Sequence, residues 1–298
     1  MPRINKLKVG TRGSALALCQ TKIVVERLKE LHPGLEIEIV TISTQGDRSI
    51  DVPLASIGDK GLFVKELENG LLHKEIDFAV HSLKDLPGEM PKGLCIAAVP
   101  KRADPSDVIV SNSLGLDELP KGARIGTGSV RRRAQLKDYR PDLVFCEIRG
   151  NLDTRLRKLD EGRYDAIILA YAGLFRMGWA ERITEKIPHA ICLPAVGQGA
   201  LAVQARDGEE DLLEILHALD HTESRTAVLA ERSLMQALGG GCQFPLGALA
   251  VVEDGTITLQ GMLAGPDGQQ ILREQISGPI NDPETLGRQL ADVFRNKQ

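Results

Sequence analysis

The spacing of apolar residues in the first quarter of the chain alternates between two periods. Apolar and β-branched residues at every second position are typical of strands, and apolar residues three and four positions apart are typical of helices. The predicted order is a strand at 7–10, a helix at 14–31, a strand at 35–42, a helix at 62–75 and a strand at 76–83. Ser14 is a natural N-cap for the first helix. This alternation predicts an α/β domain with a parallel sheet.

The same order returns in the middle of the chain. The predicted elements are strands at 123–126, 143–148 and 164–170 and helices at 129–139 and 151–162. Gly162 closes the second of these helices. The first turns of the two regions are alike, because VGTRGSALA in one corresponds to IGTGSVRRR in the other. We therefore expect two similar α/β domains that face each other across a cleft.

The pattern changes from residue 222 onward. A helix at 222–238 precedes three strand-like runs, which are separated by turn signals at Asp254-Gly255 and at 265–268. The runs are 248–253, 256–264 and 270–277, and a last helix covers roughly 282–296. These elements predict a small C-terminal α+β domain. The expected boundaries are 1–99 with 200–217 for domain 1, 100–199 for domain 2 and 218–298 for domain 3.

Composition narrows the possible classes of function. Aromatic residues make up 3% of the chain, which argues against stacking platforms for nucleic acid. The net charge is −4, so no overall basic field attracts the chain to nucleic acid or to a membrane. No apolar run approaches transmembrane length, and the N-terminus lacks the apolar core of a signal peptide. We expect a cytoplasmic protein with neither a nucleic-acid nor a membrane partner.

Positive charge is concentrated in the second α/β region. Its arginines are Arg131, Arg132, Arg133, Arg140, Arg149, Arg155 and Arg157. Three of them lie in the first turn of a predicted helix, where the helix dipole opposes each cation by about 0.3–1 kcal/mol. A solvated helix face would explain an ordinary charge run, but helix starts also bind anions, and GTGS leads directly into these arginines. Because Arg12 lies on the matching turn of the first region, we favour a cleft for a polyanion, either phosphate or polycarboxylate.

A carboxylate is expected at the corresponding edge of the first region. Asp85 lies in HSLKDLP, at the end of the third predicted strand, between Lys84 and Pro87. An Asp in a tight turn is common. In a cationic cleft, however, a carboxylate could stabilise a positively charged intermediate or move a proton. The neighbouring connection 43–61 carries Lys60, and its length is typical of a lid or of disorder.

One of the five cysteines is placed differently from the others. Cys242 follows three glycines and lies three residues before Pro245, so it is expected on an accessible turn. The other four lie in apolar or periodic stretches and are expected to be packing residues: Cys19, Cys95, Cys146 and Cys192. The odd count and the lack of C-x-x-C fit a cytosolic chain. Neither G-x-x-x-x-G-K-[ST] nor H-E-x-x-H occurs, and we predict no metal site.

Six segments carry a resemblance to a known family. They are GDKGLFVKELE, HSLKDLP, IGTGSVRRRAQL, RGNLDTRLRKLDEGRYDAIILAYAGL, LPAVGQGAL and GGGCQFPLGA. Together they resemble porphobilinogen deaminase, also called hydroxymethylbilane synthase, from about residue 7 to about residue 250. Over the remaining C-terminal residues the resemblance is weak. It implies two domains similar to periplasmic binding proteins, hinged over a cleft, and a third domain that holds the cysteine loop.

The resemblance implies a covalent cofactor and a reaction. In this family the loop cysteine, here Cys242, forms a thioether to a dipyrromethane made from the enzyme's own substrate. Four porphobilinogen molecules are added head to tail to this primer, each losing ammonia, and hydrolysis releases hydroxymethylbilane. Asp85 is implied as the catalytic carboxylate, which stabilises the cation left when ammonia departs. We expect a monomer that passes its product to the next enzyme of the pathway.

The resemblance also implies binding residues, because each pyrrole carries an acetate and a propionate. The implied cofactor-binding residues are Cys242, Ser14, Lys84, Asp85, Thr127, Ser129, Arg131, Arg132, Arg149 and Gly150. The implied substrate-binding residues are Arg12, Ser14, Lys60, Arg149, Arg155, Arg176 and Gln198. Three positions depart from the family pattern. Gly128 stands where a serine is common, Gly13 where a larger polar residue is common, and Gln45 where a basic residue is common.

Two other classes of protein remain open on the residues alone. A non-catalytic polyanion-binding protein of the periplasmic-binding type, or an effector domain of a regulator, would explain the two α/β domains and the arginines. That class leaves Cys242 unexplained and predicts an export signal or a DNA-binding segment, neither of which is seen. An enzyme that binds phosphorylated substrates through the GTGS turn would predict competition by phosphate and no covalent adduct.

Overall fold

The chain forms two compact units, each assembled from segments that are far apart in the sequence. The computed structural model describes residues 4–44, 64–240, 245–265, 268 and 270–297. The first unit consists of Met1–Arg102 and Ala200–Arg225, and the second of Ala103–Gly199 and Thr226–Gln298. The chain therefore passes three times from one unit to the other.

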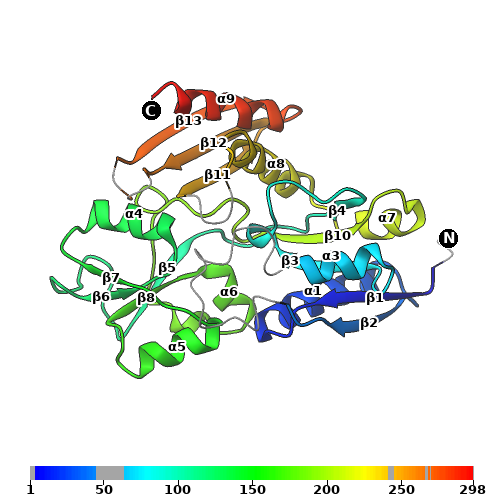
Figure 1. Cartoon of the computed structure of the whole chain (residues 1–298), viewed down its shortest axis with the longest axis horizontal. Helices are drawn as coiled ribbons and strands as arrows, with labels where there is room; N and C mark the ends of the chain where they lie inside the picture. Colours follow the sequence, from blue (N-terminus) through cyan, green and yellow to red (C-terminus); the bar gives the residue numbers. More distant parts are fainter. Residues whose placement is uncertain (1–3, 45–63, 241–244, 266–267, 269, 298) are drawn as a thin grey trace. The chain divides into compact units, whose positions relative to one another are not determined.

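The first unit holds a five-stranded sheet with the order β2-β1-β3-β10-β4 (Figure 1). Its strands are β1 (Lys6–Thr11), β2 (Glu36–Thr41), β3 (Phe78–Ser82), β4 (Leu94–Ala98) and β10 (Leu201–Arg206). Strands β1, β2 and β3 are parallel, but β10 runs antiparallel to both β3 and β4. The three predicted strands are parallel, as expected, but β10, which was not predicted, makes the sheet mixed.

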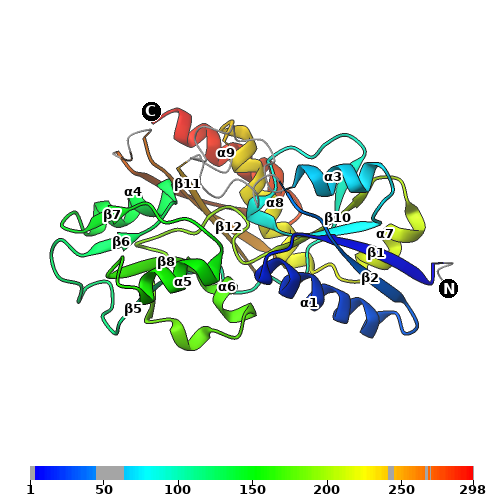
Figure 2. The ribbon, with the colours of Figure 1, turned by 60° about the horizontal axis from the view of Figure 1, so that its bottom comes forward.

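Helices cover both faces of this sheet (Figure 2). They are α1 (Ala15–Leu31), α3 (Lys65–Leu72) and α7 (Glu210–His217). Leu28 of α1 and Leu216 of α7 share a core with Phe78 of β3. Leu67 of α3 packs on the opposite face with Ala79. Because successive strand residues point to opposite faces, Phe78 and Ala79 belong to different cores.

The second unit contains a five-stranded sheet of the same design, with the order β7-β6-β8-β5-β9. Its strands are β5 (Asp107–Ser111), β6 (Arg124–Gly126), β7 (Val144–Cys146), β8 (Ala166–Ala170) and β9 (Glu185–Lys186). Strand β6 is parallel to β7 and β8, and β5 is antiparallel to β8 and β9. Position by position, β7-β6-β8-β5-β9 matches β2-β1-β3-β10-β4. The prediction of two similar α/β halves is confirmed.

The helices of the second sheet also lie on both of its faces (Figure 1). They are α4 (Val130–Tyr139), α5 (Leu152–Asp160) and α6 (Tyr171–Arg176). Leu136 of α4 packs with Ile125 and Ile168, whereas Leu156 of α5 packs with Ile167 on the other face. Helix α4 follows β6 as α1 follows β1, so the two sheets present equivalent strand-to-helix turns.

The C-terminal part of the second unit has a different architecture. It contains the antiparallel strands β11 (Leu246–Glu253), β12 (Thr256–Leu263) and β13 (Leu272–Pro279) with the helices α8 (Thr222–Ala237) and α9 (Pro283–Arg295). Asp254 and Gly255 both have positive φ, at 47° and 75°, which suits the two-residue turn that joins β11 to β12. The predicted C-terminal α+β region is confirmed. Its two helices approach closely, because a Cβ on Gly287 would lie 2.5 Å from the carbonyl oxygen of Ala230.

Candidate functional site

In the first unit, four of the predicted residues lie where β1 and β3 end. Arg12 and Ser14 follow β1, and β3 leads into a short 3-10 helix, Leu83–Asp85, which contains Lys84. Because β1 and β3 are parallel neighbours, their carboxyl ends share one edge of the sheet, where α/β proteins commonly bind ligands. We call this edge, with Arg12, Ser14, Lys84 and Asp85, the first edge.

Two buried leucines fix the turn that carries Asp85. The N–H of Leu83 donates to the carbonyl of Ala200 (3.0 Å), and the N–H of Leu86 donates to the carbonyl of Leu83 (3.1 Å). Both leucines are 1% exposed, whereas Lys84 and Asp85 between them are half-buried. The turn therefore holds a carboxylate and an ammonium group at a partly solvated position on a rigid support.

A chain of buried polar side chains lies beside this turn. His81 Nε2 is 2.9 Å from Gln204 Oε1, and Gln204 Nε2 donates to Glu68 Oε1 at 3.2 Å. Burial lowers the pKa of His81 to about 4, the hydrogen bond to Gln204 opposes this shift, and the charge of Arg12 adds to it. The imidazole is therefore neutral at neutral pH. No sequence motif marks this group of side chains, because Gln204 lies in β10, a strand that the sequence pattern does not predict.

Matching serines cap the first helix at each sheet. Ser14 Oγ accepts a hydrogen bond from the N–H of Ala17 (3.3 Å), which confirms the predicted cap. Ser129 Oγ accepts one from the N–H of Arg132 (3.4 Å), and the N–H of Ser129 donates to Thr127 Oγ1 (3.2 Å). Thr127 is fully buried. Since a capping hydroxyl acts as an acceptor, its O–H is left to donate elsewhere.

Arg131 and Arg132, at the start of α4, converge on one buried carboxylate. Arg131 Nη1 lies 2.7 Å from Asp107 Oδ2, and Arg132 donates to Asp107 Oδ1 from Nε (2.9 Å) and Nη2 (2.6 Å). The exposed fractions of the side chains are 5% for Arg131, 8% for Arg132 and 0% for Asp107. A solvated helix face is therefore the wrong interpretation for these two arginines.

Gln198 completes this group, which we call the Asp107 cluster: Asp107, Arg131, Arg132 and Gln198. Gln198 Nε2 donates to Asp107 Oδ1 (2.8 Å) and to the carbonyl of Pro105 (2.7 Å). Burial alone would raise the pKa of Asp107, but the two guanidinium groups hold it well below its usual range. Gln198 and both arginines were predicted as site residues, but Asp107, the carboxylate that joins them, was not.

The Asp107 cluster retains positive charge. Two guanidinium groups face one carboxylate, so the cluster carries one cation more than it carries anions. In addition, Nε of Arg131 is buried without a hydrogen-bond partner among the described residues. Both observations fit a site that receives an anionic group.

Arg149, Gly150 and Arg155 lie between β7 and the first turns of α5. Gly150 has φ of +109°, and a Cβ there would lie 2.7 Å from Thr154 Cγ2, so this position requires glycine. Its carbonyl accepts a hydrogen bond from Nε of Arg155 (2.8 Å), and the carbonyl of Arg149 accepts one from Lys158 Nζ (2.9 Å). Because β6 and β7 are parallel, this turn and the start of α4 share one edge of the sheet. We call it the second edge.

Arg176 and Gln198 are held by one short segment of chain. Arg176, at the end of α6, donates from Nη2 to the carbonyl of Gly199 at 2.6 Å. Gly199 adjoins Gln198, which belongs to the Asp107 cluster. A Cβ on Gly199 would lie 2.4 Å from the carbonyl oxygen of Ala103, and its φ is +87°, so the segment depends on glycine here.

Some predicted positions lie outside the described residues, namely Lys60 and Cys242, together with Gln45 and most of the connection 43–61. Of the other cysteines, Cys192 is fully buried, and the remaining three are half-buried. Burial raises the pKa of the Cys192 thiol to about 12, so this group is an inert part of the core.

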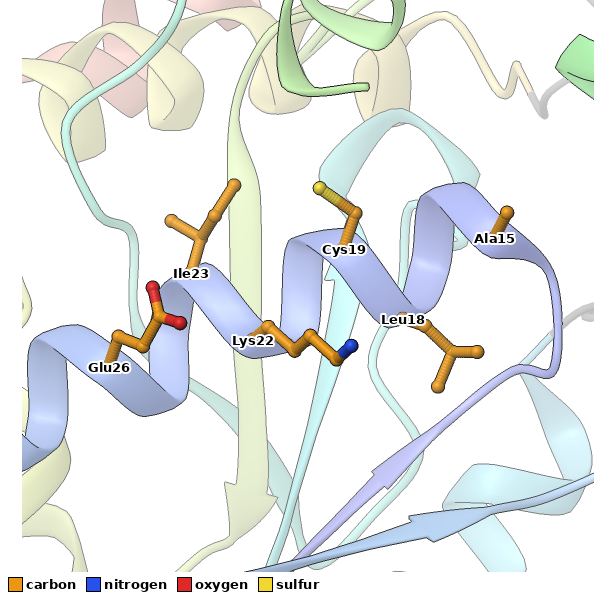
Figure 3. Close-up of a pocket in the computed structure, with 6 residues that line it drawn as sticks. All are labelled: Ala15, Leu18, Cys19, Lys22, Ile23 and Glu26. Atoms are coloured by element: carbon orange, nitrogen blue, oxygen red, sulfur yellow. The ribbon is translucent and has the colours of Figure 1, made fainter. Parts of the chain in front are cut away.

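Other features of the described structure do not coincide with the predicted site. Figure 3 shows a pocket on one face of α1, lined by Ala15, Leu18, Cys19, Lys22, Ile23 and Glu26. None of the predicted binding residues lines it. Over the described ranges, no group of three or more His, Cys, Asp and Glu side chains is arranged to hold a metal ion. The helices within these ranges include none that is both long and apolar enough to cross a membrane.

Comparisons with known proteins place nearly the whole chain in one family. Residues 7–214 match the family model described as porphobilinogen deaminase, dipyromethane cofactor binding domain, and residues 225–296 match the porphobilinogen deaminase C-terminal domain. Relatives named porphobilinogen deaminase include those of Desulforudis audaxviator (54% identical, 95% of this chain and 92% of that protein) and Synechococcus elongatus (51%, 96% and 90%). The C-terminal match extends over residues where the sequence motifs gave only a weak resemblance.

Solved structures similar to this chain include periplasmic proteins. The VFT2 domain of Bordetella pertussis BvgS is 18% identical, with a TM-score of 0.41, over 72% of this chain and 85% of that one. The probable amino-acid ABC transporter extracellular-binding protein ytmK of Bacillus subtilis is 13% identical, with a TM-score of 0.41, over 73% and 90%. Likenesses at this level support no inference about function.

The fold and the family models define the class of the protein: an α/β protein with two similar mixed sheets, a smaller antiparallel sheet and a domain for a dipyrromethane cofactor. The chain belongs to the porphobilinogen deaminase family. Members of this family are enzymes of tetrapyrrole biosynthesis. A non-catalytic polyanion-binding protein is therefore not favoured.

Proposed function

We propose that the chain is a transferase that joins four porphobilinogen molecules head to tail and releases hydroxymethylbilane. Four substrate molecules and one water give one product molecule and four molecules of ammonia. The observation that carries the proposal is the cationic second edge, with its buried Asp107 cluster, in a chain of this family. Each pyrrole brings an acetate and a propionate, and guanidinium groups bind carboxylates in a bidentate manner.

The first part of the proposal concerns the dipyrromethane group. The residues that would hold it are Cys242, by a thioether, and Ser14, Lys84, Asp85, Thr127, Ser129, Arg131, Arg132, Arg149 and Gly150. When bound, this group supplies the pyrrole carbon to which the first substrate unit is joined. The surplus positive charge of the Asp107 cluster suits its carboxylates. The capping hydroxyls of Ser14 and Ser129 have O–H donors to offer them.

The second part concerns deamination of the substrate. At neutral pH the amino group of porphobilinogen is protonated. The bond between the methylene carbon and this ammonium nitrogen breaks, the nitrogen keeps the electron pair and leaves as ammonia, and the positive charge passes to the pyrrole, which becomes an azafulvenium cation. Asp85 would stabilise this cation and accept hydrogen bonds from pyrrole N–H groups. The neutral His81 adds no competing positive charge to the first edge.

The third part concerns orientation of the substrate. Its carboxylates would bind to Arg12, Ser14, Lys60, Arg149, Arg155, Arg176 and Gln198. Several of these side chains also contact the backbone, since Arg155 donates to Gly150 and Arg176 to Gly199. Such contacts reduce the rotational freedom that a guanidinium group loses when it binds a ligand.

We place the enzyme in the cytoplasm, as a monomer whose product passes to the next enzyme of the pathway. We also retain three domains, at 1–99 with 200–217, 100–199 and 218–298, since the C-terminal sheet differs in architecture from the two mixed sheets.

The test is the intact mass of the purified, unfolded protein beside that of Cys242→Ser. A covalent excess equal to two deaminated porphobilinogen units, absent from the variant, is the expected result. If the wild-type mass is unmodified, incubation with porphobilinogen should add the adduct to the apoprotein. An unmodified mass after that incubation would contradict the proposal.

A further inference from the structure

Glu147 lies at the second edge between two arginines. Its Oε1 is 3.5 Å from Nε of Arg149, and its Oε2 is 3.3 Å from Nη2 of Arg133. The Tyr164 hydroxyl donates to the backbone carbonyl of Glu147 at 2.8 Å, which fixes the backbone at this residue. The Glu147 carboxylate therefore bridges two guanidinium groups, one from α4 and one from the turn between β7 and α5.

Gly128 makes room for this carboxylate. A Cβ on Gly128 would lie 2.9 Å from Glu147 Oε1 and 3.1 Å from the carbonyl oxygen of Ile148. Gly128 directly precedes Ser129, the N-cap of α4, so the carboxylate lies against the turn that opens this helix, where negative charge is favourable. A side chain at position 128 would collide with Glu147. The contact between Glu147 and this turn therefore depends on the absence of a side chain at position 128.

We propose that Glu147 stands in for a ligand carboxylate on Arg149 and must be displaced when a pyrrole binds there. It would thereby set how tightly this chain binds its dicarboxylate substrate. The inference rests on the proposed function, in which Arg149 binds acetate or propionate groups. Glu147 touches no reacting atom in this scheme and acts as a specificity-determining residue.

The exposure of these side chains suits a contact that exchanges. The exposed fractions are 47% for Glu147, 28% for Arg149 and 41% for Arg133. Exposed ion pairs hold weakly, and losing one corresponds to about a two- to fivefold change in a binding constant. Asp107, by contrast, is fully buried between its arginines. When a ligand binds, the Glu147 side chain can rotate out into solvent. The Asp107 side chain cannot, because it is enclosed by protein on all sides.

The test compares Glu147→Gln with the wild-type holoenzyme in two measurements. One is the split between KM and kcat for porphobilinogen. The other is Kd for a pyrrole that carries acetate and propionate but lacks the aminomethyl group, so that it binds without reacting. This Kd is measured in the holoenzyme and again in the Cys242→Ser background, where no dipyrromethane occupies Arg149. We expect KM and Kd to fall about two- to fivefold while kcat stays unchanged, because the variant removes a competitor of the ligand.

A matched control is Glu161→Gln. Glu161 also pairs with two arginines, Arg163 (2.8 Å) and Arg157 (3.8 Å), and its side chain is 37% exposed. It lies at the C-terminal end of α5, away from the second edge. This variant removes the same charge, and we expect its KM and Kd to equal the wild-type values. An equal fall in both variants would assign the effect to net charge and overturn the inference.

Gly128→Ala supplies a second, independent test. The added methyl group would occupy the space of Glu147 Oε1 and push the carboxylate away from Arg149. We expect Kd to fall as in Glu147→Gln, with no further fall in the double variant. An unchanged or raised Kd in Glu147→Gln would overturn the inference. A wild-type protein that binds the unreactive pyrrole but shows neither adduct nor turnover would refute the proposed function, while Kd would still decide the role of Glu147.

Discussion

The two five-stranded sheets have the same strand order, but the buried side chains next to their ligand-binding edges differ in charge. At the first edge, the buried residue next to the site is His81, which is neutral and hydrogen-bonded to Gln204. The half-buried residue of the same edge is a carboxylate, Asp85. At the second edge, the buried residue is a carboxylate, Asp107, and the groups that pair with it are the arginines Arg131 and Arg132. One topology therefore holds two different electrostatic environments. A neutral support suits a site for a developing cation, and an anionic support keeps a cluster of cations stable.

The largest expected effect is on turnover. Asp85→Asn should retain the fold and lower kcat by about a hundredfold or more, because a neutral amide does not offset the developing cation. The measurement is steady-state turnover of porphobilinogen, together with far-UV circular dichroism. Near-normal turnover would break the assignment of cation chemistry to the first edge.

Asp107→Asn should have the largest effect on stability. Removing the carboxylate leaves two buried guanidinium groups without a counter-charge, which costs about 3–5 kcal/mol. Asp142→Asn is the control, since Asp142 also pairs with an arginine, Arg140, at 2.7 Å but at a more exposed site. We expect the control to lose about 1 kcal/mol or less in urea unfolding. Equal losses would show that burial of the Asp107 cluster does not matter.

His81 should make stability depend on pH. Its pKa is about 4 in the folded chain against 6.5 in the unfolded chain, so the unfolded state binds more protons between these values. The stabilisation is complete above pH 6.5 and is lost as the pH falls towards 4. Between pH 7.5 and pH 5 the wild type should lose about 2 kcal/mol from this group, and His81→Gln should lack that contribution. Equal pH dependence in both proteins, measured by urea unfolding, would show that His81 is not held neutral.

The smallest expected effect is on the distribution of products. Arg149→Leu and Arg155→Leu should each stall chain growth at a particular length, because growing chains accumulate carboxylates that the second edge must bind. Intact-mass spectra at limiting porphobilinogen would show the stalled species. A wild-type distribution in both variants would mean that these arginines are surface residues without a role in elongation.

Much of the local structure could be predicted from the sequence because it depends on neighbouring residues. The cap at Ser14, the turn at Asp254-Gly255 and the repeated strand–helix order are all local signals. The central antiparallel strands were missed for a physical reason. All six residues of β10, Gln204 and Arg206 included, are buried, so the strand shows no alternation of polar and apolar positions.

The site was predicted in part for a similar reason. The basic residues could be found because they gather in a short stretch of sequence. The group that holds two of them lies elsewhere in the chain, since Asp107 precedes Arg131 by 24 residues. One signal was available, because Asp107 opens the apolar run DVIV, and an acidic residue at such a place must be paired if it is buried. The partner still could not be identified without the fold.

The position of β10 has a consequence for synthesis of the chain. This strand lies between β3 and β4 in the first sheet, yet it is translated about a hundred residues after β4. At ribosomal rates of about 5–20 residues per second, β3 and β4 therefore wait roughly 5–20 seconds for the strand that joins them. All strands of the second sheet lie within that interval. The second sheet is thus able to assemble first. The N-terminal sheet is completed only after the ribosome has synthesised β10, by which time all strands of the second sheet have been made.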